Sequence, residues 1–327
     1  MQIVSSEQAE KYISQSSKKK IAVIGDVMVD TYFWGSVSRV SPEAPVPVVD
    51  VENEDSHLGG AANVANNIKT LGAEPILYGV IGNDDAGRQT KTLLRSSGLQ
   101  DSGIFVENNR PTTVKTRIIG NHQQIVRLDK EIKSPISHET EQKIITSIEA
   151  DESLQAIVFE DYNKGMITET LIESVMKIAN SKGIPVLIDP KKDNFFAFKN
   201  CTIFKPNKKE AEQALGFTLQ TDEDIKRAGK ELLKKLQAQY ILLTLGEKGM
   251  MLFDTDGSIS SVETKAKQIA DVSGAGDTVI ATLTVLLVGG ATVSEASFIA
   301  NHAASIACSK SGIVSVTTEE LLDQLST

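Results

Sequence analysis

Short runs of β-branched and aliphatic residues alternate along the chain with longer amphipathic stretches, and this alternation restricts the fold more than any other feature of the sequence. The apolar runs are IAVIGD at 21–26, PILYGVIG at 75–82, AIVFED at 156–161, IPVLIDP at 184–190, CTIFKPN at 201–207 and YILLTLG at 240–246. Amphipathic segments such as 167–183 and 222–237 separate them. Strands that alternate with helices form a mostly parallel sheet with helices on both faces. We therefore predict an α/β fold.

Two pieces of the chain do not fit the alternation. The segment APVPVVDVE at 44–52 and the pair TTVKTRIIG and HQQIVRLD, at 112–120 and 122–129, are typical of antiparallel strands with one polar face. Gly120 and Asn121 are expected to join the pair. We predict a small accessory sheet, inserted from about 31–56 and 111–130, that serves as a lid or as a dimer interface.

Polar residues stand at the carboxyl ends of five apolar runs, namely Asp26, Asp161, Asp189, Asn207 and Thr244. Each of them alone could be a helix cap or a turn residue, which is the commoner role of Asp and Asn at such positions. In an open α/β sheet, however, the ligand crevice forms at the carboxyl ends of the strands. We therefore expect these five side chains to converge on one site.

The stretch DVSGAGDTVIATLTVLL, residues 271–287, places a loop of small residues directly before a long apolar segment. Gly274 and Gly276 allow a tight turn and a close approach to a ligand, and the free amides at the start of the following helix attract an anion. Asp277 in such a site is placed to take a proton from an attacking hydroxyl during phosphoryl transfer. The alternative is that Asp277 only stabilises the first turn of the helix, as acids do there.

The motif KPNKKE contains Asn207 and Glu210, three residues apart at the start of a predicted helix. An amide and a carboxylate on one side of a helix could orient water around Mg²⁺ that bridges ATP phosphates. They could equally form a capping box, in which each side chain binds the other residue's backbone amide. The pair taken alone favours the capping box.

Two glycine-containing motifs also have both a binding and a structural interpretation. Thr244, Gly246 and Gly249 in TLGEKGM suit a cradle for nucleotide phosphates, or an ordinary turn between two strands. The segment HLGGAANVANNIKTLG at 57–72 has paired glycines before a helix that carries Asn63. Such residues permit the close approach of a polar ligand or of another backbone, and the sequence alone does not decide between them.

Several classes of protein are excluded or made less favourable. The net charge of −9, from 34 basic and 43 acidic residues, argues against a nucleic-acid or anionic-membrane partner. Cys201 and Cys308 are far apart, and the four histidines lack metal-ligand spacing, so we expect neither a disulfide framework nor a structural zinc. No segment reaches the length of a membrane span or has the form of a signal peptide, which predicts a cytoplasmic protein. Neither a Walker A motif nor a GxGxxG fingerprint is present.

Together and in this order, the motifs resemble those of the ribokinase-like (PfkB) carbohydrate kinases. The likeness runs over essentially the whole chain, through GD after the first strand, GGAANVANN, the antiparallel insert, DP, PNKKE, TLGEKG and DVSGAGD. It implies one kinase domain over 1–327 with the three-layer fold of that family. By this resemblance Asp277 would be the catalytic base, the amides of Gly274, Ala275, Gly276 and Asp277 the anion hole, Asn207 and Glu210 a pair that holds Mg²⁺ through water, and Asn301 part of the adenine side.

A closer likeness involves GDVMVDTYFWGSVSRVSPEAPVPVV, NHQQIVRLD and DYNKG, which are similar to the kinase part of the heptose 7-phosphate kinases of lipopolysaccharide inner-core synthesis. The likeness implies that D-glycero-β-D-manno-heptose 7-phosphate is phosphorylated at C1. The sugar-binding residues would be Asp26, Asp30, Gly59, Gly60 and Asn63. The candidates for the existing phosphate, chosen because guanidinium and ammonium groups suit a dianion, are Arg39, Arg88, Arg117 and Lys164. For at least one of these four we expect only a solvated surface charge.

The resemblance also implies partners and leaves alternatives open. ATP and Mg²⁺ would be required, and monovalent cations commonly activate such kinases. We expect a homodimer through the accessory sheet, and a separate adenylyltransferase, because many relatives carry a fused nucleotidyltransferase domain. Asn163, Ser273 and Glu160 depart from the family pattern, although none replaces a catalytic group. The alternatives are a kinase of the same fold for fructose 6-phosphate, ribose or a nucleoside, and a sugar- or nucleotide-binding regulator without activity.

Overall fold

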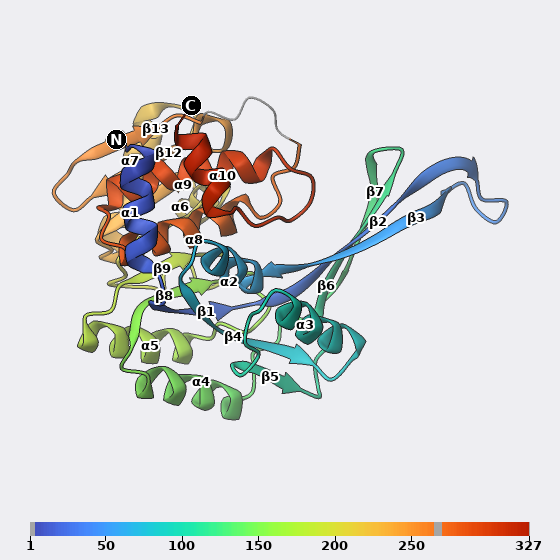
Figure 1. Cartoon of the computed structure of the whole chain (residues 1–327), viewed down its shortest axis with the longest axis horizontal. Helices are drawn as coiled ribbons and strands as arrows, with labels where there is room; N and C mark the ends of the chain where they lie inside the picture. The colour runs from blue at the N-terminus through green and yellow to red at the C-terminus, as the bar shows by residue number, and fades with distance from the viewer. Residues whose placement is uncertain (1–3, 265–269, 327) are drawn as a thin grey trace.

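The computed structural model describes residues 4–264 and 270–326, and its centre is a nine-stranded sheet (Figure 1). The strands are β1 (Lys20–Gly25), β4 (Glu74–Gly82), β5 (Ile104–Glu107), β8 (Leu154–Glu160), β9 (Val186–Asp189), β10 (Ile203–Phe204), β11 (Tyr240–Thr244), β12 (Met250–Asp254) and β13 (Ile259–Val262). Their order across the sheet is β13-β12-β11-β10-β9-β8-β1-β4-β5. All neighbours from β11 to β5 pair in parallel, and only β12 and β13 are antiparallel. The predicted mostly parallel α/β fold is confirmed.

Helices cover both faces of this sheet, because the strands are apolar on both faces. In β1, Ile21 and Val23 belong to one apolar cluster, whereas Ala22 and Ile24 belong to the other. The first cluster includes residues from α1 (Ser6–Ser16), α2 (Ala61–Thr70), α3 (Asp85–Ser96), α8 (Ala275–Val288), α9 (Val293–Cys308) and α10 (Thr318–Leu325). The second includes residues from α4 (His138–Ala150), α5 (Glu169–Lys182), α6 (Lys208–Leu215) and α7 (Asp222–Leu236). The result is a three-layer arrangement.

Helix α8 is buried in the interior along most of its length. Its residues 277 to 286 are all buried, and it packs against α9, α2 and α1. A helix that is apolar on every side must be enclosed in this way. Among the described residues, no helix is both long and apolar enough to cross a membrane.

A second sheet projects from the body of the molecule (Figure 1). This projecting sheet has the order β3-β2-β6-β7 and consists of β2 (Val27–Val40), β3 (Pro47–Gly60), β6 (Thr113–Gly120) and β7 (Gln123–Lys130). Strands β2 and β6 pair in parallel, and the two outer pairs are antiparallel. The sheet thus includes more of the chain than the predicted segment 31–56. Strand β2 starts directly after β1, and β3 ends directly before α2.

The turn between β6 and β7 differs by one residue from the prediction. Asn121 and His122 are the turn residues, with φ values of 51° and 65°, and Gly120 is the last residue of β6. A two-residue hairpin turn with positive φ at both positions matches the twist of the strands and favours Asn. The Asn121 side chain also accepts a hydrogen bond from the Val37 amide at 3.2 Å and donates one to the Val37 carbonyl at 3.2 Å, which ties the hairpin to β2.

Candidate active site

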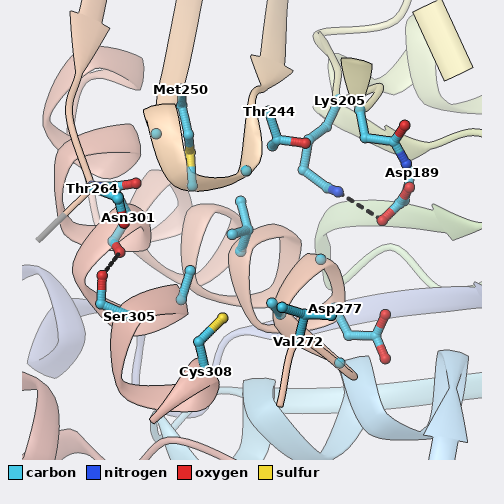
Figure 2. A pocket seen from close by; sticks show the side chains of 18 of the residues that line it. Asp189, Lys205, Thr244, Met250, Thr264, Val272, Asp277, Asn301, Ser305 and Cys308 are labelled. Carbon is cyan, nitrogen blue, oxygen red and sulfur yellow. Dashed lines mark hydrogen bonds and ion pairs between the residues drawn. The ribbon is translucent and has the colours of Figure 1, made fainter. Parts of the chain in front are cut away.

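A cavity of about 670 Å³ lies at the carboxyl ends of the central strands (Figure 2). Asp189, Asn207 and Thr244, which end or follow β9, β10 and β11, line it together with the start of α8. Three of the five predicted strand-end residues therefore meet in one cavity. Asp26 and Asp161 instead bind the loop after β8, where Asp161 accepts the Asn163 amide at 2.7 Å.

The start of α8 is open toward this cavity. Its N-cap is Gly274, with φ of 77°, and no side chain caps the helix. A side chain at 274 would be strained by this φ, and its Cβ would lie 2.9 Å from Nδ2 of Asn63. A Cβ at Gly276 would lie 3.4 Å from Oδ2 of Asp189 and 3.5 Å from Nζ of Lys205. The start of α8 thus lies close to a lysine ammonium, and free helix amides together with a positive charge favour an anion.

Asp277 is buried at this helix start, with 2% of its surface exposed. The Asn63 side chain donates to its Oδ2 at 2.8 Å, and the Tyr162 hydroxyl donates to its Oδ1 at 2.9 Å. Burial raises the pKa of Asp277 to about 6, with the nearby charge of Asp189 adding to the rise and the two hydrogen bonds opposing it. A carboxylate whose pKa is near neutrality is suited to accept a proton at physiological pH.

A buried cluster of charges lies beside Asp277. Carboxylate oxygens of Glu160, Asp189 and Asp277 are all within 4.8 Å of one another. Lys205 pairs with Asp189 at 2.7 Å, as Figure 2 shows, and Lys191 is 3.4 Å from Asp189. Burial alone would raise the pKa of Asp189, but the two ammonium groups outweigh it and lower that pKa. Asp189 is therefore ionised and holds both lysines at the edge of the cavity.

Glu160 is the exception in this cluster. Its side chain is fully buried, and within the described ranges neither of its carboxylate oxygens has a hydrogen-bond partner. Burial, followed by the charges of Asp189 and Asp277, raises the pKa of Glu160 well above its usual value. Glu160 therefore keeps its proton to a higher pH than an exposed carboxyl group does, since an unpaired buried carboxylate is costly.

Asn207 and Glu210 form a capping box at the start of α6, which is the alternative that the motif alone favoured. The Asn207 amide donates to Glu210 Oε2 at 2.8 Å, and the Glu210 amide donates to Asn207 Oδ1 at 2.9 Å. The other Glu210 oxygen, Oε1, lies 2.8 Å from Nζ of Lys191. Both residues nevertheless line the cavity.

The remaining residues predicted for the nucleotide side also line the same cavity, namely Thr244, Gly246, Gly249 and Asn301. Gly249 has φ of 82°, and a Cβ there would lie 1.9 Å from the Val262 carbonyl oxygen, so only glycine fits this turn. Asn301 on α9 donates to the Glu263 carbonyl at 2.9 Å. Figure 2 shows Met250, Thr264 and Ser305 near Asn301, whereas Val272 lies beside Asp277; Cys308 lines the same cavity.

The residues predicted to bind sugar lie where the projecting sheet joins the body. Asp26 follows β1, and its carboxylate accepts the amides of Tyr162 at 2.8 Å, Lys164 at 3.1 Å and Met166 at 3.1 Å. Asp26 thus fixes the loop that carries Tyr162. Gly60 is the N-cap of α2, which, like α8, has no side-chain cap.

Gly59 leaves space that is filled by Asp30, another residue that is predicted to bind the sugar. A Cβ at Gly59 would lie 1.9 Å from Oδ2 of Asp30, so only glycine is accommodated at this position. Asp30 on β2 is itself buried and bonded to Arg117 on β6. The two neighbouring strands therefore hold an acid and a base together at the foot of the projecting sheet.

The four candidates for a phosphate ligand fall into two groups. The Arg39 and Arg88 side chains are 67% and 68% exposed, and each pairs with an acid on the surface. The Arg117 and Lys164 side chains are only 13% and 12% exposed, and they pair with Asp30 and Glu131. Arg39 lies near the far end of the projecting sheet, next to the tip of the β2–β3 hairpin (Figure 1). Arg39 therefore lies away from the residues at the base of the projecting sheet.

Sequence reasoning missed several residues of the site. Lys205 directly follows the end of β10 in FKPN, and Lys191 stands two residues after the end of β9 in DPKK; this position was the signal that could have indicated them. Tyr162 stands within DYNKG, but nothing in the sequence indicates that its hydroxyl contacts Asp277. Lys115 pairs with Glu131 at 3.3 Å, and Arg110 donates to the Lys164 carbonyl, which adds two basic residues near Lys164.

The geometry defines an α/β protein with an uncapped helix start and a buried carboxylate at one cavity, and comparison with known proteins gives its family. Residues 18–320 match the model for the pfkB family of carbohydrate kinases. The chain therefore belongs to this family. It is 40% identical to the bifunctional protein HldE of Geotalea uraniireducens over 97% of its length, and 41% identical to that of Helicobacter hepaticus over 96%. In both cases the chain spans 65% of the length of the relative.

Solved structures give the same fold. A ribokinase of Arabidopsis thaliana, complexed with ribose and ATP, matches with a TM-score of 0.75 and 20% identity, over 95% of this chain and 99% of the other. Phosphofructokinase-2 of Escherichia coli, in complex with substrates and products, matches with a TM-score of 0.79 and 17% identity, over 94% and 98%. The three-layer fold with its projecting sheet is thus ribokinase-like, as the sequence predicted.

Proposed function

We propose that this protein transfers the γ-phosphoryl group of ATP to the C1 hydroxyl of D-glycero-β-D-manno-heptose 7-phosphate, in the synthesis of the lipopolysaccharide core. The observation that carries the proposal is the buried Asp277 carboxylate at the uncapped start of α8, inside the main cavity. Family membership supports a carbohydrate acceptor. The similarity of GDVMVDTYFWGSVSRVSPEAPVPVV and DYNKG to heptose 7-phosphate kinases supports this particular sugar.

In the proposed reaction, Asp277 takes the proton of the acceptor hydroxyl as the hydroxyl oxygen bonds to the γ-phosphorus. The bond between that phosphorus and the bridging oxygen breaks, and ADP leaves with the electron pair. The amides of Gly274 to Asp277 and the Lys205 ammonium stabilise the charge on the transferring group, since fixed donors in a buried site need no reorganisation. The cavity walls exclude the water that would otherwise hydrolyse ATP.

The nucleotide side is proposed to consist of Thr244, Gly246, Gly249 and Asn301. Mg²⁺, when bound, would neutralise charge on the nucleotide phosphates. Asn207 and Glu210 offer the oxygen atoms that this ion prefers. Because those oxygens already serve the capping box and Lys191, we propose that the two residues hold the ion through water rather than directly.

The existing phosphate of the sugar is proposed to bind at the base of the projecting sheet, to Arg117, Lys164 and Lys115. Their charges are sheltered, so their interaction with a dianion is weakly screened. Lys164→Gln should raise the KM for the sugar phosphate about tenfold or more while leaving the KM for ATP unchanged. Glu131 keeps its second partner, Lys115, in this variant. Arg88→Gln is the matched control on the exposed group, and an equal effect of both variants would exclude this assignment.

The projecting sheet is proposed to act as a lid and as the interface of a homodimer. Its exposed large apolar side chains are Val40, Val46, Val51, Ile125, Val126 and Leu128, of which Val46 lies in the β2–β3 turn. A second copy would cover both these side chains and the open strand edges. Sedimentation equilibrium should give a dimer for the native chain, and a monomer at the same concentration would contradict the proposal.

A panel of acceptors tests the proposed reaction. ADP release would be measured with heptose 7-phosphate, fructose 6-phosphate, ribose and a nucleoside, each with ATP and Mg²⁺. We expect heptose 7-phosphate to give the highest kcat/KM. It should exceed the values for ribose and the nucleoside by about 10² or more, because a site built around a phosphate partner rejects acceptors that lack a phosphate. A higher kcat/KM for another acceptor would identify that acceptor as the substrate in place of heptose 7-phosphate. If no acceptor gave ADP release, the protein would be a binding protein without kinase activity.

A further inference from the structure

Asp277 is held by two hydrogen-bond donors, one on each carboxylate oxygen. Asn63 Nδ2 donates to Oδ2 at 2.8 Å, and the Tyr162 hydroxyl donates to Oδ1 at 2.9 Å. Asp277 is only 2% exposed, so an acceptor hydroxyl can reach one of its carboxylate oxygens only if a neighbouring side chain moves aside. The surroundings of the two donors indicate which one leaves.

Asn63 lies in the first turn of α2, which follows Gly59 and Gly60, two residues that are predicted to bind the sugar. Its Nδ2 is 2.9 Å from the position of a Cβ at Gly274, so the amide covers the open start of α8. Asn67 Nδ2 donates to Asn63 Oδ1 at 3.1 Å, which turns the Asn63 NH₂ group toward Asp277. An amide carries both donors and an acceptor, so Asn63 can exchange the carboxylate for a sugar hydroxyl without loss of hydrogen bonds.

Tyr162 lines the main cavity, binds the other carboxylate oxygen of Asp277, and is held at both its backbone and its ring. Its backbone amide donates to Asp26 at 2.8 Å, and the Lys191 ammonium lies 5.0 Å from the centre of its ring. Burial, together with the charges of Asp277, Glu160 and Asp189, raises the pKa of Tyr162 well above its usual value. The phenol therefore stays protonated and remains a donor over the whole working pH range.

We propose that Tyr162 is a positioning residue for the base: its hydroxyl stays on Oδ1 of Asp277 throughout the reaction, while the acceptor hydroxyl displaces the Asn63 amide from Oδ2 and gives its proton to that oxygen. The proposal rests on the proposed kinase function. The oxygen that loses the proton bonds to the γ-phosphorus, the bond to the bridging oxygen breaks, and the proton stays on Asp277 until product leaves.

A hydrogen bond to a carboxylate stabilises its ionised form, so the phenol also sets the pH at which the base works. Without it, Asp277 would hold its proton up to a higher pH. The acidic limb of the pH dependence of kcat/KM would then move upward. A residue with only a structural role would instead lower the rate by the same factor at every pH.

The test compares Tyr162→Phe with Tyr12→Phe. Tyr12 provides a matched control because its hydroxyl also donates to a carboxylate, Glu295, at 3.1 Å, on the surface helix α1 and away from the cavity. We expect Tyr162→Phe to move the acidic limb upward by about one pH unit, the size of one hydrogen bond to a charged group, and to lower kcat with little change in the KM for ATP. Tyr12→Phe should leave both the acidic limb and kcat unchanged. An unmoved limb in Tyr162→Phe would overturn the proposal.

A second measurement separates this proposal from the proposed function. The pKa of Asp277 would be measured by ¹³C NMR of the labelled carboxyl carbon in both variants and in the native chain, without substrate. A higher pKa in Tyr162→Phe together with no turnover of any sugar phosphate would leave the hydrogen-bonding role intact and overturn the proposed function. Turnover of heptose 7-phosphate by the native chain, together with an unchanged pKa of Asp277 in Tyr162→Phe, would support the proposed function and overturn the positioning role of Tyr162.

Discussion

The helices α8 and α6 both begin at the main cavity, but they satisfy their first amides in opposite ways. Helix α6 begins with a closed capping box, in which Asn207 and Glu210 bind each other's amides. Helix α8 begins at Gly274 without any side-chain cap, and α2 is the only other α-helix in residues 4–264 and 270–326 to do so. The remaining described α-helices start with a capping Ser, Thr, Asp or Asn side chain.

The two helix starts therefore differ in their role within one cavity: one stabilises the fold, and the other is available to a ligand. A helix start that has a protein partner for its amides is stable without a ligand. A helix start whose amides lack a protein partner is stabilised when an anion binds to those amides. We infer that the start of α8 is reserved for the transferring phosphoryl group, and that the start of α6 is primarily part of the scaffold. Four substitutions test this contrast, ordered by their expected effect on turnover.

The largest effect is expected from Asp277→Asn. The amide keeps the size of the side chain but cannot accept a proton, so kcat should fall by about 10² or more, the usual scale of a positioned base, while ATP binding persists. Turnover would be measured by coupled ADP release and binding by calorimetry. Asp222→Asn, in the exposed first turn of α7, is the matched control. Near-native turnover of Asp277→Asn would remove the base from the mechanism.

Gly276→Ala is expected to have the next largest effect. The new methyl group would make only ordinary contacts, at 3.4 Å from Asp189 and 3.5 Å from Lys205, so the fold and Tm should be unchanged. The methyl would, however, occupy the space between the helix start and the lysine. We expect kcat/KM for ATP to fall by about tenfold or more, because anion stabilisation depends on close approach. A normal kcat/KM would show that the phosphoryl group lies elsewhere.

Asn207→Ala tests the α6 side of the comparison. Loss of the cap should lower the free energy of unfolding by about 1 kcal/mol. Thr221→Ala removes the cap of the capping box at α7, away from the cavity, and should have a similar cost. The Mg²⁺ concentration that supports half-maximal turnover would be measured in both. A rise only in Asn207→Ala would give the capping residue a second role in metal binding, and no rise would confine it to the scaffold.

Glu160→Gln should change turnover least, since Gln resembles a protonated Glu in size and polarity. The raised pKa of Glu160 means that the folded chain must retain a proton that the unfolded chain releases above about pH 4.5. The native protein therefore loses stability relative to the variant as pH rises from that value. Melting curves at pH 5 and pH 8 should show an advantage for Glu160→Gln that grows with pH. An advantage independent of pH would mean that Glu160 is not the titrating group.

Much of the fold could be predicted because its signals are local. The apolar runs coincide with β1, β4, β8, β9, β10 and β11, and the amphipathic segments coincide with α5 and α7. Hydrophobic periodicity reports such elements directly. The motif SGAGD also predicted a tight turn before the helix, because glycine takes a φ such as the 77° at Gly274 without steric cost. The contact of Asp277 with Tyr162 has no such local signal.

The charged cluster of the site could not be predicted, because it depends on which strands are neighbours. Glu160 and Asp189 are 29 positions apart in the sequence, yet they are partners in the ladder between β8 and β9. The next strand, β10, brings Lys205 to within 2.7 Å of Asp189. Periodicity predicts each strand but contains no information on the order or register of strands in a parallel sheet.

The sequence alone thus determined the α/β class, the glycines that open α8, and the acid that follows them, since these depend on backbone conformation and hydrophobic pattern within a few residues. Only the tertiary structure decided that Asp277 is clamped between Asn63 and Tyr162, that Glu160 is buried without a partner, and that Lys164 is sheltered whereas Arg88 is exposed. Burial and charge pairing act between segments far apart in the chain. They exist only once the sheet has placed those segments side by side.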